Sequence, residues 1–564
     1  MDWRSGARCD LLARELRGAR GRPAPEQLDL QALRARLLLD QGRTREALDA
    51  YQRMGRGGAN GWRSVQALTG AARGELGLGR PERAMDRLAE ALRAWALDDE
   101  MPPELDERDR REAATGALAG LVIDLATGSG ADSTDPIRVR AAYDTLQRIR
   151  ARALIERTLG PQRPAELPIR FALAPLGADS LQRAVLRPGD LLLDVWPGAR
   201  PPFLFALTRD SVRLARLPSD VTRRAVAFTS AIAAGPSGVD SAAWDSAAAR
   251  LGASLLGPVA DLVRASRRVV IATEGELVTL PWGTLILLDP RAPPAPLAAD
   301  HEVLQAPSFT WWAATRRTRP ELRAARVLAL AGPAGENGAA TAALAEVEDL
   351  GARFRHVDVV SSGHSRLAIT PDRLADDDVL QLVTPTRADA FHPWYSGILL
   401  EALEVNRDPT WRASDMAGAR LRARLVVLPS CAPGGRGTVA GAGIDALATA
   451  LLSAGADAVV VNRWRVDEGS ATRWMEAFYD RLGSGATAAE AFASAEQTMR
   501  ADPATQAPVH WAGFALIGDG DVKAPLERRP RWWWPAIAAA GILIAALALV
   551  VGTRRRARVR ALEN

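Results

Sequence analysis

The chain has 564 residues, of which 48% are hydrophobic and 25% are charged, and its net charge is +5. This length suits about three or four domains with sizeable cores, and so small a positive balance gives little support to a nucleic-acid partner. The two cysteines, Cys9 and Cys431, lie far apart, and the five histidines show no HExxH or paired spacing. We therefore expect no disulfide framework, no metal site and no cofactor.

Residues 28–159 show a helical pattern almost throughout. An apolar helix, a glycine turn and an alanine-bearing helix occur twice, with the turn glycines Gly42 and Gly79 placed 37 residues apart. This spacing is close to the roughly 34 residues of tetratricopeptide repeats, whose stacked helix pairs share one core. We expect degenerate repeats of this kind over residues 1–135 that bind a protein partner, and a connecting helix within 136–164. A plain helical bundle is the alternative.

Short apolar runs of strand length begin at about residue 165. Two of them flank a Pro/Gly turn and predict a hairpin, and the others alternate with helical stretches. The runs are 191–196, 203–207, 269–272, 327–331, 379–383, 425–428 and 459–461. This alternation predicts an α/β fold, in which a mostly parallel sheet has helices on both faces. Such sheets carry their reactive groups at the carboxyl ends of the strands.

The segment 425–443, LVVLPSCAPGGRGTVAGAG, places Cys431 just past the carboxyl end of a buried strand. A cysteine at this position is suited to act as a nucleophile, although many buried cysteines are only small hydrophobic residues. Gly434 and Gly435 fit a tight turn whose backbone N–H groups form an oxyanion hole beside it. The absence of GxxxxGK[ST] and GxGxxG patterns argues against nucleotide binding at this loop.

Four motifs along the chain occur in an order that resembles the CHAT domain, a caspase-like relative of cysteine peptidases. They are EGEL with LPW within 274–282, HEV with APS within 301–308, GADAVV with WRVD within 455–467, and HWAGFALIGD at 510–519. The resemblance covers about 139–524 and implies a caspase-like domain, which we assign to residues 165–524. It also implies that Cys431 is the nucleophile.

The resemblance further implies a catalytic histidine after the strand that precedes the cysteine strand, in the pattern HxxxHG. Here Gln381 holds the first histidine position and Pro385 holds the second, catalytic one, while HPWYSGILL at 392–400 keeps the register. A proline side chain neither accepts nor donates a proton, so the catalytic pair is broken. His392, seven residues further on, is a candidate substitute base, with an exposed loop histidine as the alternative. Ala442 replaces the acidic residue of the family pattern GxxGEG.

The segment 532–552, WWWPAIAAAGILIAALALVVG, is an uncharged apolar run long enough to span a bilayer. Tryptophans mark one end and arginines follow the other. This pattern predicts a transmembrane helix within residues 525–564. Since no signal peptide is visible, we expect a single-pass protein of the bacterial inner membrane with its bulk in the cytoplasm, and the periplasm is the alternative.

Two functions follow from these expectations. In the first, the chain is a membrane-anchored pseudo-peptidase whose repeats bind a protein and whose CHAT fold is a scaffold or regulatory platform. In the second, it is an active cysteine endopeptidase that uses Cys431 with His392 as the base. Loss of one member of a catalytic triad costs several powers of ten in rate, so we favour the first function.

Overall fold

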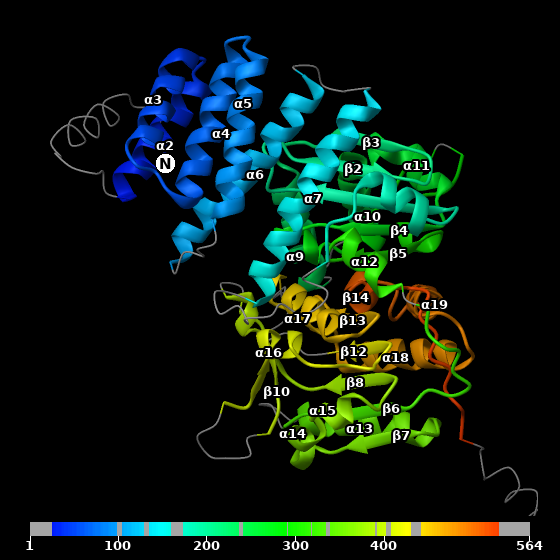
Figure 1. The fold of residues 1–564 in the computed structure, drawn as a ribbon. Helices are drawn as coiled ribbons and strands as arrows, with labels where there is room; N and C mark the ends of the chain where they lie inside the picture. The colour runs from blue at the N-terminus through cyan, green and yellow to red at the C-terminus, as the bar shows by residue number, and fades with distance from the viewer. Residues whose placement is uncertain are drawn as a thin grey trace, which may run out of the picture.

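The computed structural model describes residues 25–98, 104–128, 135–159, 173–235, 241–289, 291–316, 318–333, 339–389, 392–401, 408–429 and 441–529. The N-terminal helices stack beside one half of a large sheet that carries helices on both faces (Figure 1). The C-terminal part of the chain forms the other half of that sheet.

Two helix pairs open the described chain. They are α2 (Pro25–Asp40) with α3 (Thr44–Arg56), and α4 (Gly61–Gly77) with α5 (Pro81–Leu97). Gly42 and Gly79 turn the chain within each pair at φ values of 75° and 72°, a conformation that glycine adopts without strain. Each helix packs on the next one along the chain. The two glycine turns therefore belong to two successive helix pairs, as the repeat pattern predicts.

Helices α6 (Leu105–Thr127) and α7 (Pro136–Leu159) join these pairs to the sheet. The guanidinium of Arg150 on α7 lies 2.6 Å from the carboxylate of Asp194, and both side chains are fully buried. The same arginine donates to the carbonyl oxygen of Val195 at 3.0 Å, and Gln147 donates to Asp194 at 2.6 Å. A buried ion pair needs such additional hydrogen bonds. These contacts fix the connecting helix to the first strand.

The main sheet has eleven strands in the order β3-β2-β1-β4-β5-β14-β13-β12-β8-β6-β7. They are β1 (Asp190–Trp196), β2 (Phe203–Leu207), β3 (Val212–Arg216), β4 (Arg268–Ala272), β5 (Glu302–Ala306), β6 (Val327–Ala331), β7 (Val357–Val360), β8 (Val379–Val383), β12 (Leu425–Leu428), β13 (Ala458–Asn462) and β14 (Phe514–Gly518). The pairs β1–β2, β2–β3 and β13–β14 are antiparallel, whereas β1–β4, β4–β5 and the pairs from β7 to β13 are parallel. The predicted hairpin and the mostly parallel sheet are confirmed.

Helices cover both faces of the sheet, and the side chains of β8 alternate between them. Val379 and Val383 belong to the same buried cluster as residues of α13 and α18, while Leu380 and Leu382 pack with residues of α16 and α17. The longer covering helices are α9 (Val221–Ala234), α10 (Ser241–Leu255), α13 (Ala339–Arg353), α17 (Gly441–Ala454), α18 (Glu468–Gly483) and α19 (Ala488–Ala501), and α16 (Ala413–Ala417) is short. A second sheet joins β9 (Thr386–Arg387), β10 (Gly397–Leu399) and β11 (Thr410–Arg412).

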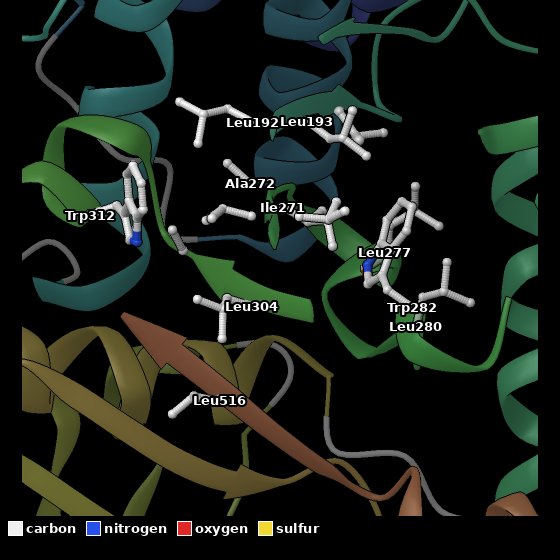
Figure 2. Close-up of a cluster of buried hydrophobic side chains, with 14 of the residues drawn as sticks. Leu192, Leu193, Ile271, Ala272, Leu277, Leu280, Trp282, Leu304, Trp312 and Leu516 are labelled. Atoms are coloured by element: carbon white, nitrogen blue, oxygen red, sulfur yellow. The ribbon is translucent and has the colours of Figure 1, made fainter. Parts of the chain in front are cut away.

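A continuous apolar core underlies the first half of the sheet. Figure 2 shows side chains of β1, β4 and β5 meeting Trp282 and Trp312, with Leu516 of β14 facing Leu304. Trp282 and Leu280 are 1% and 0% exposed, so the LPW motif serves to fill this core. Replacement of a buried tryptophan by alanine costs about 3–5 kcal/mol of stability.

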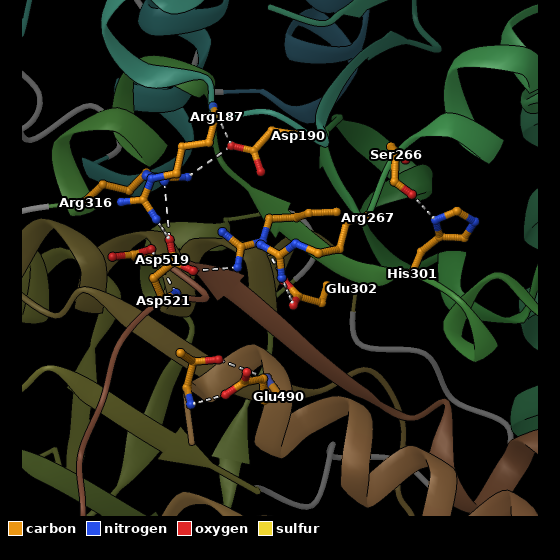
Figure 3. Close-up of polar contacts among 12 residues, drawn as sticks. Arg187, Asp190, Ser266, Arg267, His301, Glu302, Arg316, Glu490, Asp519 and Asp521 are labelled. Carbon is orange, nitrogen blue, oxygen red and sulfur yellow. Dashed lines mark hydrogen bonds and ion pairs between the residues drawn. The ribbon is translucent and has the colours of Figure 1, made fainter. Parts of the chain in front are cut away.

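An ionic cluster links β14 to the strands of the first half (Figure 3). Arg268 of β4 contacts Glu302 at 2.7 Å and Asp521, just after β14, at 2.5 Å. Arg316 lies 3.3 Å from Asp521 as well. Burial raises the pKa of the nearby Asp519 to about 6. The segment that leaves β14 is therefore held against β4 by opposite charges.

Within the described residues, no helix has both the length and the apolar character that crossing a membrane requires. Helices α6 and α7 have 23 and 24 residues, but both carry charged residues along their length, and a span needs about 20 mostly apolar residues. This finding contradicts the predicted single-pass location in a bacterial inner membrane. The segment 532–552, on which that prediction was based, lies outside the described residues.

Candidate active site

The candidate site lies where β8 and β12 end. These strands are parallel neighbours, with Gln381 opposite Val427, so the residues that follow them emerge at the same edge of the sheet. Pro385 comes two residues after β8, and Cys431 comes three residues after β12. Cys431, Gly434 and Gly435 lie outside the described residues.

Pro385 contributes only its backbone to this edge. Its carbonyl oxygen accepts a hydrogen bond from the amide of Leu399 at 2.8 Å. The preceding residue, Thr384, is buried and donates its hydroxyl to the carbonyl oxygen of Leu399. These two bonds fasten β10 to the end of β8. Pro385, which the sequence predicts at the catalytic histidine position, thus holds a strand and has no side-chain group able to accept a proton.

Gln381 points to the other face of the sheet, under α13 and α18. Its amide nitrogen donates to the carboxylate of Glu346 at 2.6 Å, and its amide oxygen accepts from the hydroxyl of Tyr479. The side chain of Gln381 is 1% exposed. Burial raises the pKa of Glu346 to about 7, and the bond from Gln381 opposes this shift. Gln381, which the sequence predicts at the first histidine position, therefore belongs to a hydrogen-bond chain with Glu346 and Tyr479.

His392 lies in the loop that precedes η7 (Pro393–Tyr395). Its amide donates to Asp389 at 2.8 Å, and its Nδ1 atom lies 3.6 Å from the other carboxylate oxygen of Asp389. The ring also contacts Trp394 and Tyr395, with centroids 5.5 and 5.8 Å away. The side chain is one-third exposed. Asp389 therefore fixes the backbone of His392 through its amide, and its carboxylate lies near Nδ1 at a distance longer than a hydrogen bond.

Three helices pack on the loop that carries His392. Residues of η7 contact α17 and α7, and Arg108 of α6 lies over the ring of Trp394. Gly443 of α17 approaches so closely that a Cβ atom there would lie 2.7 Å from the hydroxyl of Ser396 and 2.9 Å from Ala388. Helix α17, which follows Cys431 in the chain, thus meets α6 and α7 at the loop that carries His392.

Three other histidines have partners on elements away from this edge. Nδ1 of His301 lies 2.8 Å from the carbonyl oxygen of Ser266, and His356 lies 3.4 Å from Glu527. Nδ1 of His510 lies 2.9 Å from Asp467 and, equally, 2.9 Å from the hydroxyl of Ser470. In the part of the chain that the structure describes, no three His, Cys, Asp or Glu side chains gather in a way that would hold a metal ion.

The sequence could not reveal the partners of Gln381. Glu346 lies 35 residues before it and Tyr479 lies 98 residues after it, on two different helices. Tyr479 appears in the sequence only as part of an apolar helix face, and Glu346 as one of several acidic residues on its helix. A buried glutamate leaves no local signal, because its burial depends on where the helix lands on the sheet.

The described chain is an α/β protein preceded by stacked helix pairs. Residues 245–519 match the family described as the CHAT domain. Mouse tetratricopeptide repeat protein 28 is 38% identical over 111 residues, and the human protein of the same name is 37% identical over 111 residues. Each alignment covers 20% of this chain and only 4% of the relative's own length. Together these matches support the architecture of tetratricopeptide-like repeats followed by a CHAT domain.

Two crystal structures of the Saccharomyces cerevisiae separase–securin complex also align with this chain. The alignments cover 92% and 91% of this chain and 48% of the solved chain, with TM-scores of 0.46 and 0.45. The sequence identity is 8% in both. Similarity at this level carries no argument about function.

Proposed function

We propose that this chain is a catalytically degenerate caspase-like peptidase that acts as a protein-interaction or regulatory scaffold. Cys431 keeps the nucleophile position, and Pro385 replaces the catalytic histidine. The proposal rests on the bonding of Pro385 and Gln381, because the first offers only a carbonyl oxygen and the second is committed to Glu346 and Tyr479. Without an adjacent base, a cysteine thiol keeps a pKa of about 8.5 and is mostly protonated at neutral pH.

The helical repeats are the proposed docking part of this scaffold. Stacked helix pairs form extended surfaces that other repeat proteins use for binding. Their connection to the CHAT domain runs through α7, which is fixed to β1 by the Arg150–Asp194 pair and also contacts α16 and α17. A protein bound to the repeats would therefore act on the same helices that pack around the candidate site.

One observation favours an alternative function, an active cysteine endopeptidase with His392 as the base. The carboxylate of Asp389 lies 3.6 Å from Nδ1 of His392, on the side of the ring where an acidic residue orients a catalytic imidazole in active enzymes. For this alternative to hold, Nε2 of His392 must lie within hydrogen-bond reach of the Cys431 thiol, about 3 Å or somewhat longer without substrate.

Alkylation of Cys431 by iodoacetamide distinguishes the two functions. In a Cys9→Ser background Cys431 is the remaining thiol, because the chain has two cysteines. We expect slow alkylation at pH 7 and a rate that changes less than about twofold when His392→Ala is added, since an unactivated thiol depends on no base. His364→Ala, which removes an exposed histidine elsewhere, is the matched control. A fall of about tenfold or more with His392→Ala alone would overturn the scaffold proposal.

A further inference from the structure

A groove separates α13 and α18 on the face of the sheet that carries Gln381. Its volume is about 360 Å³, and side chains from successive turns of both helices form its walls. This size falls within the range of about 300–1,000 Å³ that small-molecule sites occupy. The groove lies on the opposite face of β8 from α16 and α17, so it is distinct from the packing around His392.

Glu346 lies at the base of this groove without a compensating positive charge. One oxygen of its carboxylate accepts the bond from Gln381, and the interactions that act on it among the described residues include no cation. Arg353 also lines the groove, but its guanidinium is committed to Asp349 at 3.3 Å and to Asp480. A carboxylate that has lost part of its hydration needs such a partner or else takes up a proton more readily.

The rim of the groove adds more negative charge. Asp349 on α13 and Glu468 and Glu476 on α18 line it, and all three side chains are exposed. With Glu346, four carboxyl groups and one arginine line the groove, and that arginine pairs with one of the four, Asp349, and with Asp480. A groove lined by one sign of charge attracts ligands of the opposite sign.

We propose that this groove binds a small organic cation of the guanidinium or alkylammonium class. The charged head of the ligand pairs with Glu346, and its alkyl part lies against the buried side chains of Leu350 and Met475. A planar guanidinium suits this partner, because it can donate two parallel hydrogen bonds to one carboxylate. Free polyamine-like cations and an arginine or lysine side chain of a bound protein share this chemistry.

Binding of such a cation depends on pH in a defined direction. The titratable and charged groups that line the groove with Glu346 are Asp349 and Arg353 from its own helix, and Glu468, Glu476 and Tyr479 from α18, while Gln381 of β8 bonds to it directly. Tyr479 stays neutral because burial raises its pKa well above the ordinary value. Since burial raises the pKa of Glu346 to about 7, the carboxyl group in the empty groove is more protonated at pH 6 than at pH 8, and a cationic ligand must displace that proton. The affinity should therefore rise from pH 6 to pH 8.

Calorimetric titration of the full chain tests the proposal with two probes, agmatine and a capped pentapeptide with one central arginine. We expect at least one probe to bind, with Glu346→Gln weakening it tenfold or more at pH 8 and Glu476→Gln weakening it two- to fivefold. Glu348→Gln, an exposed glutamate of the same helix outside the groove, is the control and should bind like the unsubstituted chain. Tighter binding of agmatine identifies a free cation, and tighter binding of the peptide identifies a protein side chain.

The proposal is wrong if neither probe binds at millimolar concentration, or if Glu346→Gln and Glu348→Gln bind equally. It is also wrong if the affinity is the same at pH 6 and pH 8. Unfolding curves of each variant test whether weaker binding results from loss of the fold. Glu476→Gln changes an exposed side chain, so this variant should fold like the unsubstituted chain.

Discussion

The guanidinium of Arg108 lies 4.9 Å from the ring centroid of Trp394. Arg108 belongs to α6, and Trp394 belongs to η7, two residues after His392. Burial lowers the pKa of Arg108, and the nearby Tyr395 and Asp389 oppose this shift. Contacts of this kind are worth about 0.5–2 kcal/mol. Arg108 of the helical region therefore contacts the loop that carries the candidate base, His392.

Replacing Arg108 by alanine should loosen this loop. We expect faster amide hydrogen exchange over residues 392–396 and a loss of global stability of about 1 kcal/mol, because the cation–π contact is partly exposed. Arg138→Ala is the control, since Arg138 pairs with Asp135 at the surface, 3.3 Å away, with 65% of its side chain exposed. Equal exchange in the two variants would mean that Arg108 does not brace the loop.

Two glycines of the helix pairs should respond to alanine in opposite ways. A Cβ atom at Gly70 on α4 would lie 2.3–2.5 Å from ring atoms of Tyr51, whereas one at Gly55 on α3 would meet nothing within 4 Å. Gly70→Ala should therefore cost about 1–3 kcal/mol through overpacking. Gly55→Ala should stabilise the chain by about 0.5–1 kcal/mol, because alanine favours helix more than glycine does. Urea unfolding measures both changes, and a neutral Gly70→Ala would contradict the close packing of α3 on α4.

Glu490 lies near the start of α19 and Glu496 lies in its middle. Their contributions to the stability of the fold should depend on pH in opposite directions. Burial raises the pKa of Glu496 to about 8, with Arg500 and Arg463 opposing the shift, so the folded state holds a proton that the unfolded state has released. Its contribution to stability therefore falls as pH rises from about 4.5 to 8, by at most about 1.4 kcal/mol per pH unit. Glu496→Gln should unfold at higher urea than the unsubstituted chain at pH 8 and at the same urea at pH 4.

Glu490 is the matched comparison. Its carboxylate accepts from the amide of Thr487 at 2.8 Å in a capping box, drawn in Figure 3, and this bond lowers its pKa. The stabilisation is present above the unfolded pKa and is lost as pH falls through the folded pKa. Glu490→Gln should therefore destabilise the chain at pH 7 and lose that effect at pH 3. If the stabilities of Glu496→Gln and Glu490→Gln, relative to the unsubstituted chain, changed with pH in the same direction, the environments assigned to these two carboxyl groups would be wrong.

Features that depend on local sequence were predicted well. The strands β4, β6, β8, β12 and β13 appear as apolar runs, and the turns at Gly42 and Gly79 appear as a repeat, because each is determined by adjacent residues. The strands β9, β10 and β11 were missed, since two or three residues give no periodicity. The Glu346 groove was missed as well, because it arises from the spacing of two helices far apart in the chain. The predicted membrane location was wrong.

Measurement of the alkylation rate of Cys431 as a function of pH tests the central claim most directly. In the Cys9→Ser background, we predict a rate that rises through an apparent thiol pKa of about 8 or higher, as for a cysteine without a base. An apparent pKa below about 7, lost in the His392→Ala variant, would contradict the claim. That result would show that a substitute base activates the nucleophile and that the chain retains the chemistry of a cysteine peptidase.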